Sequence, residues 1–143
     1  MSAAAIKATY NWLCTGDEIF PEMVAAIDAA QISVCLETYT FTDSSLGIRF
    51  LEALTRAAQR GAKVRVLIDG LGSIGLPWSF WDLLRAAGGE VRIFNPLSLN
   101  RGWIRNHRKL LTVDSRVAFV GGFNIAPEYE GDGVKCGWCD VGL

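Results

Sequence analysis

Two different spacings of apolar side chains are recognisable in the first half of the chain. Over residues 32–37, apolar side chains occupy every second position, which is the period of a half-buried β-strand. Over residues 46–57, apolar positions recur every three or four residues, as in an amphipathic helix, and Gly61 follows as a stop signal. A second strand pattern covers residues 63–68. The sequence therefore predicts a strand–helix–strand unit with parallel strands.

Similar patterns predict the remaining elements. Further strands are expected over residues 8–13, 91–94, 107–113 and 117–120, and further helices over residues 15–30 and 77–87. The segment from Thr15 to Glu18 has a capping-box pattern, and a turn at Asp114 and Ser115 joins the last two strands into a hairpin. Strands that alternate with helices through short connections predict an α/β fold, with a mostly parallel mixed sheet flanked by helices.

The length and composition of the chain limit its class. With 143 residues, half of them apolar and a fifth charged, it is expected to form one globular domain over residues 1–143. The net charge of −1 argues against binding nucleic acid over a broad face, which needs a strongly basic surface. No apolar run reaches the roughly 18 to 20 residues that span a bilayer, and the first residues lack the features of a signal peptide. The sequence thus predicts a soluble or peripheral domain.

The four cysteines do not form a recognisable metal site. Cys14 and Cys35 fall in predicted strands, while Cys136 and Cys139 form a single Cys-x-x-Cys pair. A structural zinc site usually needs four ligands. We therefore expect incidental thiols in a reducing compartment, and no bound metal.

The residues that can carry chemistry cluster in the predicted hairpin. The two-residue period of a strand puts His107 and Lys109 side by side on one face. A neutral imidazole can attack a phosphodiester while a neighbouring ammonium group neutralises the phosphate oxygens. Just past the second strand, Gly122 offers bare backbone and Asn124 a carboxamide, and both can donate hydrogen bonds to a phosphate. This constellation predicts phosphodiester chemistry.

The same residues have ordinary structural interpretations. A single histidine in a strand is usually a structural residue, and the basic stretch 101–109 can be a solvated loop rim as well as a phosphate site. The aromatic side chains of Trp78, Phe80 and Trp81 suit core packing better than contact with lipid headgroups. Two acidic residues at the ends of predicted strands can line the same pocket: Glu37 and Asp69.

The complete spacing of these residues is more specific than any one of them. The pattern His-x-Lys-x4-Asp followed by Gly-Gly-x-Asn resembles the motif of the phospholipase D superfamily. The stretch RNHRKLLTVDSRVAFVGGFNI is similar to the bacterial cardiolipin synthase branch of that superfamily, and the similarity extends upstream through LETYTFTDSSLGIRFLEALTRAAQRGAKVRVLIDGLGS. The resemblance implies a phospholipase D-like fold for nearly the entire chain.

The resemblance also assigns a role to each motif residue. It implies that His107 attacks phosphorus to form a phosphohistidine, and that Lys109 and Asn124 bind the phosphate. Asp114 is the third named residue of the motif, but its position at a strand end indicates that it holds the turn and the strand ends by hydrogen bonds. A carboxylate that orients the histidine is expected in a Trp-x-Asp context, which Asp140 matches.

The implied function is that of a cardiolipin synthase-like phosphatidyltransferase or phospholipase D without a cofactor. Its substrate would be a phospholipid such as phosphatidylglycerol, met by peripheral contact at the cytoplasmic side of a bacterial membrane. Sites of this superfamily combine two motif copies, whereas this sequence has one histidine. We therefore expect an N-terminal half, truncated at its C-terminus, that needs a second motif-bearing half or an identical chain. Two alternatives stay open: a single-motif phosphodiesterase or nuclease acting as a homodimer, and a non-catalytic phosphate- or lipid-binding fragment.

Overall fold

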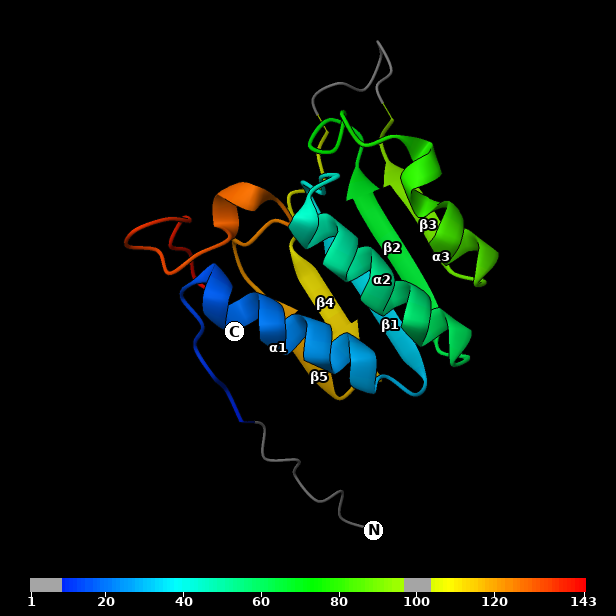
Figure 1. Ribbon diagram of the computed structural model, residues 1–143, viewed down its shortest axis with the longest axis horizontal. Coiled ribbons are helices and arrows are strands. Elements are labelled where there is room, and N and C mark those ends of the chain that lie inside the picture. The colour runs from blue at the N-terminus through cyan, green and yellow to red at the C-terminus, as the bar shows by residue number, and fades with distance from the viewer. Residues whose placement is uncertain (1–8, 97–103) are drawn as a thin grey trace.

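The computed structural model describes residues 9–96 and 104–143, which form one five-stranded sheet (Figure 1). The strands are Ser33–Thr38 (β1), Lys63–Asp69 (β2), Glu90–Phe94 (β3), Leu110–Val113 (β4) and Val117–Val120 (β5). They lie in the order β3-β2-β1-β4-β5. β2 pairs in parallel with β1 and β3, whereas β4 runs antiparallel to β1 and β5. The predicted mixed sheet of an α/β fold is thus confirmed.

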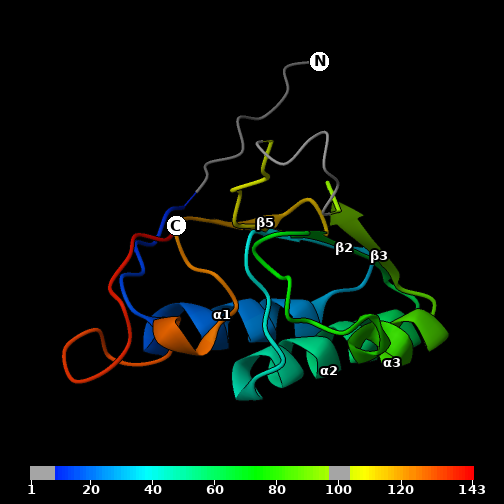
Figure 2. The ribbon, with the colours of Figure 1, turned by 90° about the horizontal axis from the view of Figure 1, so that it is seen from above.

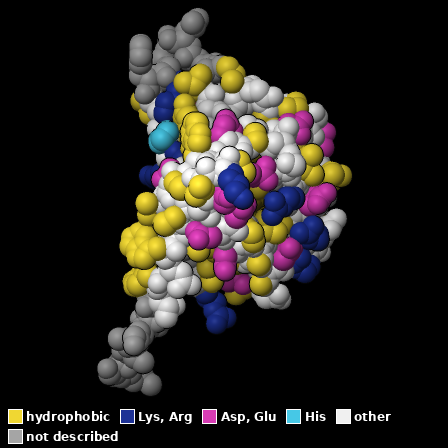
Figure 3. Space-filling model, turned by 60° about the vertical axis from the view of Figure 1, so that its left-hand side comes forward, with side chains coloured by type: hydrophobic (Ala, Val, Ile, Leu, Met, Phe, Trp, Pro, Cys, Tyr) yellow, Lys and Arg dark blue, Asp and Glu magenta, His cyan; other side chains and the backbone are white. Residues whose placement is uncertain are grey.

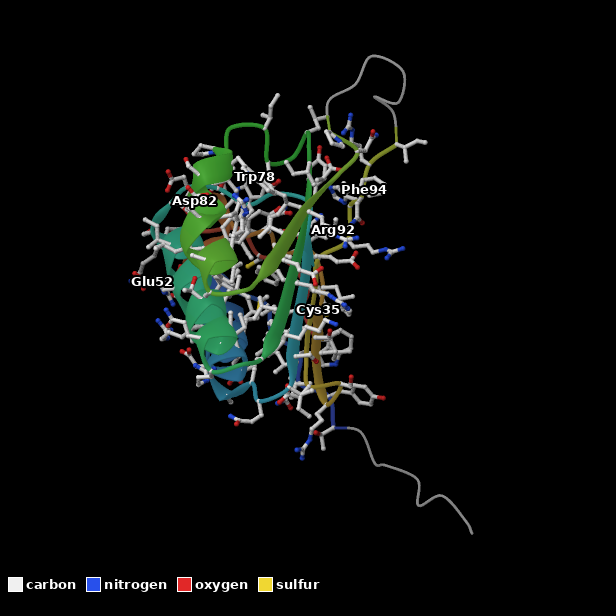
Figure 4. All side chains as sticks on the ribbon, turned by 90° about the vertical axis from the view of Figure 1, so that its right-hand side faces the viewer. Cys35, Glu52, Trp78, Asp82, Arg92 and Phe94 are labelled. Atoms are coloured by element: carbon white, nitrogen blue, oxygen red, sulfur yellow. The ribbon has the colours of Figure 1, made fainter. Side chains whose placement is uncertain are left out.

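Helices cover one face of this sheet. They are Gly16–Ala29 (α1), Ser45–Gln59 (α2) and Asp82–Ala86 (α3), with short 3-10 helices at Trp78–Trp81 (η1) and Pro127–Tyr129 (η2). Seen from above, α1, α2 and α3 lie on the same side of the sheet (Figure 2). Cys35 and Arg92 point away from the helices on the opposite face (Figure 4). Among the described helices, none has the length and apolar character needed to cross a membrane.

The hydrophobic core lies between α1, α2 and the sheet. Leu36 of β1 stands opposite Leu111 of β4, and both side chains are buried. The ring of Phe20 in α1 meets Phe50 of α2 edge to face, with 6.0 Å between the ring centroids. Alternate side chains of the central strands therefore enter one apolar layer, which fixes the register of the sheet and with it the position of the strand ends.

The structure confirms the local signals at several element ends. Thr15 and Glu18 form the capping box at the start of α1. Gly61 follows α2 with a φ of 93°, a region that favours glycine. Asp114 and Ser115 have φ values of 53° and 54°, as in the tight turn of a right-twisted hairpin.

Three predicted elements differ from the structure. Residues 8–13 were expected as a strand, but within the described part only Leu13 pairs, through a single bridge to Gly142. Residue 8 lies outside the described residues. The strand expected over residues 107–113 begins at Leu110, where pairing with β1 ends opposite Glu37. The helix expected from Pro77 begins as a 3-10 turn before it becomes α3.

Candidate functional site

His107 and Lys109 lie directly before β4, at the end of the sheet where β1 and β2 finish. The Lys109 Nζ atom is 3.0 Å from His107 Nδ1 and 3.2 Å from the His107 carbonyl oxygen. The same Nζ atom lies 3.3 Å from His107 Nε2, so the ammonium group approaches both ring nitrogens. Which of the two can accept a hydrogen bond from it depends on the tautomer of the ring. The expected proximity of the two side chains is confirmed, although they precede the strand.

The histidine ring is open to solvent. Figure 3 shows the one histidine side chain of the chain, in cyan, at the surface beside lysine and arginine side chains. A substrate phosphate can therefore approach His107 without displacing part of the described fold.

Tyr39, which the sequence analysis missed, contacts both residues. Its ring centroid is 4.6 Å from that of His107, with 49° between the planes, and 5.6 Å from Lys109 Nζ. The second contact is a cation–π interaction. Tyr39 directly follows β1, the antiparallel neighbour of β4. Its place at the end of a predicted strand was the feature of the sequence that could have indicated a site residue. The tyrosine limits the orientations open to the imidazole and to the ammonium group.

Lys109 is also influenced by Asp140. Burial of its side chain lowers the pKa of Lys109, and the negative charge of Asp140 opposes this lowering. The Asp140 carboxylate accepts a hydrogen bond from the Val141 amide at 2.7 Å. No hydrogen bond joins Asp140 to His107 in the described part of the chain, so the orienting role of Asp140 stays a prediction.

A buried carboxylate holds the backbone just before the histidine. Asp69, at the end of β2, is completely buried, and its Oδ2 accepts the Asn106 amide at 2.9 Å. Its Oδ1 accepts the amides of Leu71 at 2.9 Å and Gly72 at 3.3 Å, and lies 3.5 Å from the Arg105 guanidinium. One side chain thus joins the loop after β2 to the segment that carries His107.

A second carboxylate reaches the same segment from β1. Glu37 Oε2 accepts a hydrogen bond from Asn106 Nδ2 at 3.2 Å and lies 3.5 Å from the guanidinium of Arg108. The structure therefore brings the two acidic residues considered from the sequence together around Asn106. Within the basic stretch 101–109, Arg105 is paired with Asp69 and Arg108 with Glu37. Residues 101–103 lie outside the described residues.

Gly122 and Asn124 are engaged in contacts within the fold. The Gly122 amide donates to the Val141 carbonyl at 3.1 Å. The buried carboxamide of Asn124 accepts from the Thr40 amide at 3.0 Å and donates to the Tyr129 hydroxyl at 2.8 Å. Both residues position chain segments around the site, and their binding of phosphate stays a prediction.

Asp114 lies at the opposite end of β4 from the histidine. Its carboxylate accepts the amides of Gln31 at 2.9 Å and of Ile32 and Ser33 at 2.8 Å each. These bonds, chiefly the one from Ser33, lower the pKa of Asp114. The expected hydrogen-bonding role is confirmed, since Asp114 ties the turn after β4 to the start of β1. Asp114 therefore lies apart from His107 and Lys109. A direct catalytic role of Asp114 stays a prediction.

Comparison with known proteins identifies the family. The family described as "Cardiolipin synthase, PLD-like domain" matches residues 23–130, about three quarters of the chain. The chain belongs to this PLD-like family. The matched range includes His107, Lys109, Asp114 and Asn124, and ends before Asp140.

Curated relatives of this PLD-like domain are cardiolipin synthases. The chain is 39% identical over 131 residues to "Cardiolipin synthase" of Clostridium perfringens, covering 87% of this chain and 27% of that protein. It is also 39% identical over 131 residues to "Major cardiolipin synthase ClsA" of Bacillus subtilis, covering 88% and 27%. The chain thus spans about a quarter of the length of these relatives.

Solved structures show the same fold. Nuc from Salmonella typhimurium, described as a phospholipase D family member, superposes with a TM-score of 0.65 at 21% identity, over 92% of this chain and 80% of that one. NucT from Helicobacter pylori gives a TM-score of 0.69 at 19% identity, over 92% and 81%. The predicted phospholipase D-like fold is confirmed.

The aromatic side chains of η1 in this PLD-like domain differ in how far they are buried. Trp81 is completely buried and Phe80 packs on the core, as expected, but Trp78 is 44% exposed.

All four cysteines are free thiols, and Cys14 precedes α1 without belonging to a strand. The described residues hold no group of three or more side chains suited to a metal ion.

Proposed function

We propose that this domain supplies the nucleophilic half of a phosphatidyltransferase site of the phospholipase D type. The observation that carries the proposal is the 3.0 Å contact between Lys109 Nζ and a ring nitrogen of a solvent-exposed His107. The imidazole is the nucleophile, and the ammonium group is close enough to neutralise the phosphate oxygens during attack. The similarity to cardiolipin synthases supports a phospholipid substrate such as phosphatidylglycerol.

The reaction has two steps. In the first, a ring nitrogen of neutral His107 forms a bond to phosphorus, the bond from phosphorus to the headgroup oxygen breaks, and that oxygen takes a proton from an acid. In the second, an acceptor hydroxyl gives its proton to the conjugate base of that acid and its oxygen bonds to phosphorus. The phosphorus–nitrogen bond then breaks and regenerates the imidazole. A lipid hydroxyl as acceptor gives transfer, and water gives hydrolysis.

The acid comes from outside this chain in the proposed scheme. His107 is the one histidine of the sequence and is covalently occupied when the leaving oxygen needs its proton. Lys109 is committed to the phosphate, and a carboxylate would need a strongly raised pKa to act as the acid. A second motif-bearing half or an identical chain therefore completes the site. We also propose that the complete site works by peripheral contact at the cytoplasmic side of a bacterial membrane, where its lipid substrate lies.

The test is to trap the covalent intermediate with two lipid substrates. One is phosphatidylglycerol carrying labelled phosphorus, whose leaving alkoxide needs a proton. The other is the corresponding phosphatidyl nitrophenol, whose leaving group departs as an anion without an acid. After alkaline quenching, the nitrophenyl lipid is expected to label the peptide that contains His107, and a His107→Asn variant should carry no label. An unlabelled wild-type chain, or a label that survives in His107→Asn, would overturn the proposal.

In a second candidate function, an identical chain supplies the second motif. The single histidine favours it, because two-fold pairing of like faces is the simplest source of a second imidazole. Such a dimer could act as a phosphodiesterase, although the net charge of −1 disfavours a nucleic-acid substrate. Sedimentation together with phosphatidylglycerol turnover, measured across protein concentration, distinguishes the two. Activity that rises with dimer formation supports the homodimer.

A further inference from the structure

Exposed apolar side chains gather at the sheet edge that carries His107. Leu71, Ile74 and Trp78 belong to the segment that follows β2, and their exposed fractions are 41%, 65% and 44%. Ile104, shortly before the histidine, is 61% exposed. Figure 4 shows Trp78 at the same end of the domain as the C-terminal end of β3. We call these four apolar residues the apolar rim.

Two residues of the apolar rim line a cavity beside Asp69. A cavity of about 180 Å³ is lined by Ile74 and Trp78 from the rim, by Ile93 of β3 and by Asp69. Asp69 also binds the Asn106 amide, one residue before the histidine. Ile104 is tied to this region because its carbonyl accepts a hydrogen bond from Asn95, which directly follows β3. Asp69 is therefore the link between this cavity and the segment that carries His107.

Cationic side chains accompany the rim. The Arg85 guanidinium carbon lies 5.2 Å from the centroid of the Trp78 ring, although Asp82 partly neutralises it at 3.2 Å. The side chain of Arg108 is 73% exposed, although its guanidinium lies 3.5 Å from Glu37 Oε2. An aromatic ring with a cation over its face, next to exposed aliphatic side chains, is typical of surfaces that enter a membrane interface.

We propose that the apolar rim is the surface by which this domain contacts a bilayer containing anionic phospholipid. Leu71, Ile74, Trp78 and Ile104 enter the boundary between headgroups and acyl chains, and Arg85 and Arg108 meet the headgroup phosphates. A headgroup then reaches His107 while its acyl chains stay in the membrane. The proposal rests on the proposed function only for the identity of the lipid, because binding to vesicles needs no chemistry.

The experiment measures cosedimentation of the chain with vesicles of phosphatidylglycerol or of phosphatidylcholine. The wild-type chain is expected to bind phosphatidylglycerol vesicles more tightly, and added salt should weaken that binding. Ile74→Ser and Ile104→Ser should each lower the partition coefficient by roughly tenfold, because each removes one aliphatic side chain from the lipid. The matched control is Ile32→Ser, since Ile32 is 68% exposed at the opposite end of the sheet, and its binding should equal that of the wild type.

The outcomes separate this proposal from the proposed function. His107→Asn should bind vesicles like the wild type, so normal binding without a trapped intermediate would count against the chemistry alone. Equal losses in Ile74→Ser and Ile32→Ser, or no loss in either, would overturn the apolar rim. So would binding to phosphatidylcholine as tight as to phosphatidylglycerol. If Ile74→Ser instead dissociates a dimer in sedimentation and leaves vesicle binding unchanged, the rim is an interface between copies and the proposal fails.

Discussion

Replacing Asp69 with asparagine tests whether a buried carboxylate positions His107, the proposed nucleophile. Its Oδ1 accepts the amides of Leu71 and Gly72, and an asparagine carbonyl can keep both bonds. The Oδ2 atom, which accepts the Asn106 amide at 2.9 Å, becomes an NH2 group in the variant. Two donors then face each other in a site where the residue at position 69 is completely buried. The variant therefore removes the Asn106 hydrogen bond and the negative charge 3.5 Å from the Arg105 guanidinium, with almost no change of volume.

The expected effects follow from that contact. A lost hydrogen bond to a charged acceptor, with a donor left unsatisfied, costs about 1.5 to 3 kcal/mol of the free energy of unfolding. For a chain of this size this corresponds to a fall in Tm of about 5 to 10 °C. The amide of Asn106 must move to find water, and displacement of a reacting group by about 1 Å can lower a rate about 100-fold. Asp69→Asn should accordingly slow intermediate formation from phosphatidyl nitrophenol about 100-fold.

Two assays check the stability and the position separately. Urea unfolding gives the free energy, with Asp28→Asn as control because the Asp28 side chain is 38% exposed and its pair with Arg56 should contribute less than about 1 kcal/mol. The proton NMR signal of the imidazole reports the position, and it is unambiguous because His107 is the one histidine. Asp69→Asn should shift that signal, whereas Asp28→Asn should leave it unchanged.

Two results would count against a positioning role for Asp69. If Asp69→Asn is destabilised as expected but forms the intermediate at the wild-type rate with an unshifted imidazole signal, the carboxylate supports the fold and does not position the nucleophile. A variant as stable as the wild type would contradict the hydrogen bond itself.

The remaining predictions concern the motif residues and the absence of a cofactor. His107→Asn should abolish turnover in a complete site and retain the circular dichroism spectrum of the fold, because an amide cannot form the covalent intermediate; residual activity near wild type would end the assignment. Lys109→Met should cost about 2.7 to 4 kcal/mol of transition-state stabilisation, and a fall of less than tenfold in rate would remove Lys109 from direct contact with the phosphate. Chelators should leave the rate unchanged, since the lysine supplies the positive charge near the phosphate; strict dependence on added magnesium or zinc would contradict the scheme. The lowered pKa of Asp114 means that its carboxylate stabilises the fold above its ordinary pKa and that this contribution is lost as pH falls through the lower, folded-state value. Tm measured from about pH 6 to about pH 2 should therefore fall less steeply in Asp114→Asn than in the wild type.

Local periodicity was sufficient to predict the central strands and helices. Residues 32–37, 46–57 and 63–68 each follow one period over a full element, and β1, α2 and β2 occupy nearly the same positions. The proximity of His107 and Lys109 was also predictable, because two residues spaced by two remain neighbours in any extended backbone. The start of β4 was not predictable from the sequence, because it depends on where pairing with β1 ends.

Contacts between distant segments could not be predicted from the sequence. Tyr39 is 68 positions from His107, and Asp69 is 37 positions from Asn106. Their meeting depends on strand order and register, which place the end of β2 and the end of β1 beside the segment before β4. The sequence placed Asp69 at a strand end, where it could line a site. It gave no reason to expect that Asp69 accepts hydrogen bonds both from the loop after β2 and from Asn106 before the histidine.

The spacing of the motif is explained by the length of one strand. The four residues between Lys109 and Asp114 are β4 itself, so the lysine stands at the start of this strand and the aspartate at its end. At the start, Lys109 lies beside the exposed His107 and can meet a phosphate. At the end, the carboxylate accepts three amides at and just before the start of β1 and fixes how β4 lies against it. Because β1 and β4 are antiparallel, fixing β4 at that end also sets where its other end lies relative to Glu37 and Tyr39. The aspartate can thus contribute to the site through the register of the sheet, without touching the reacting atoms.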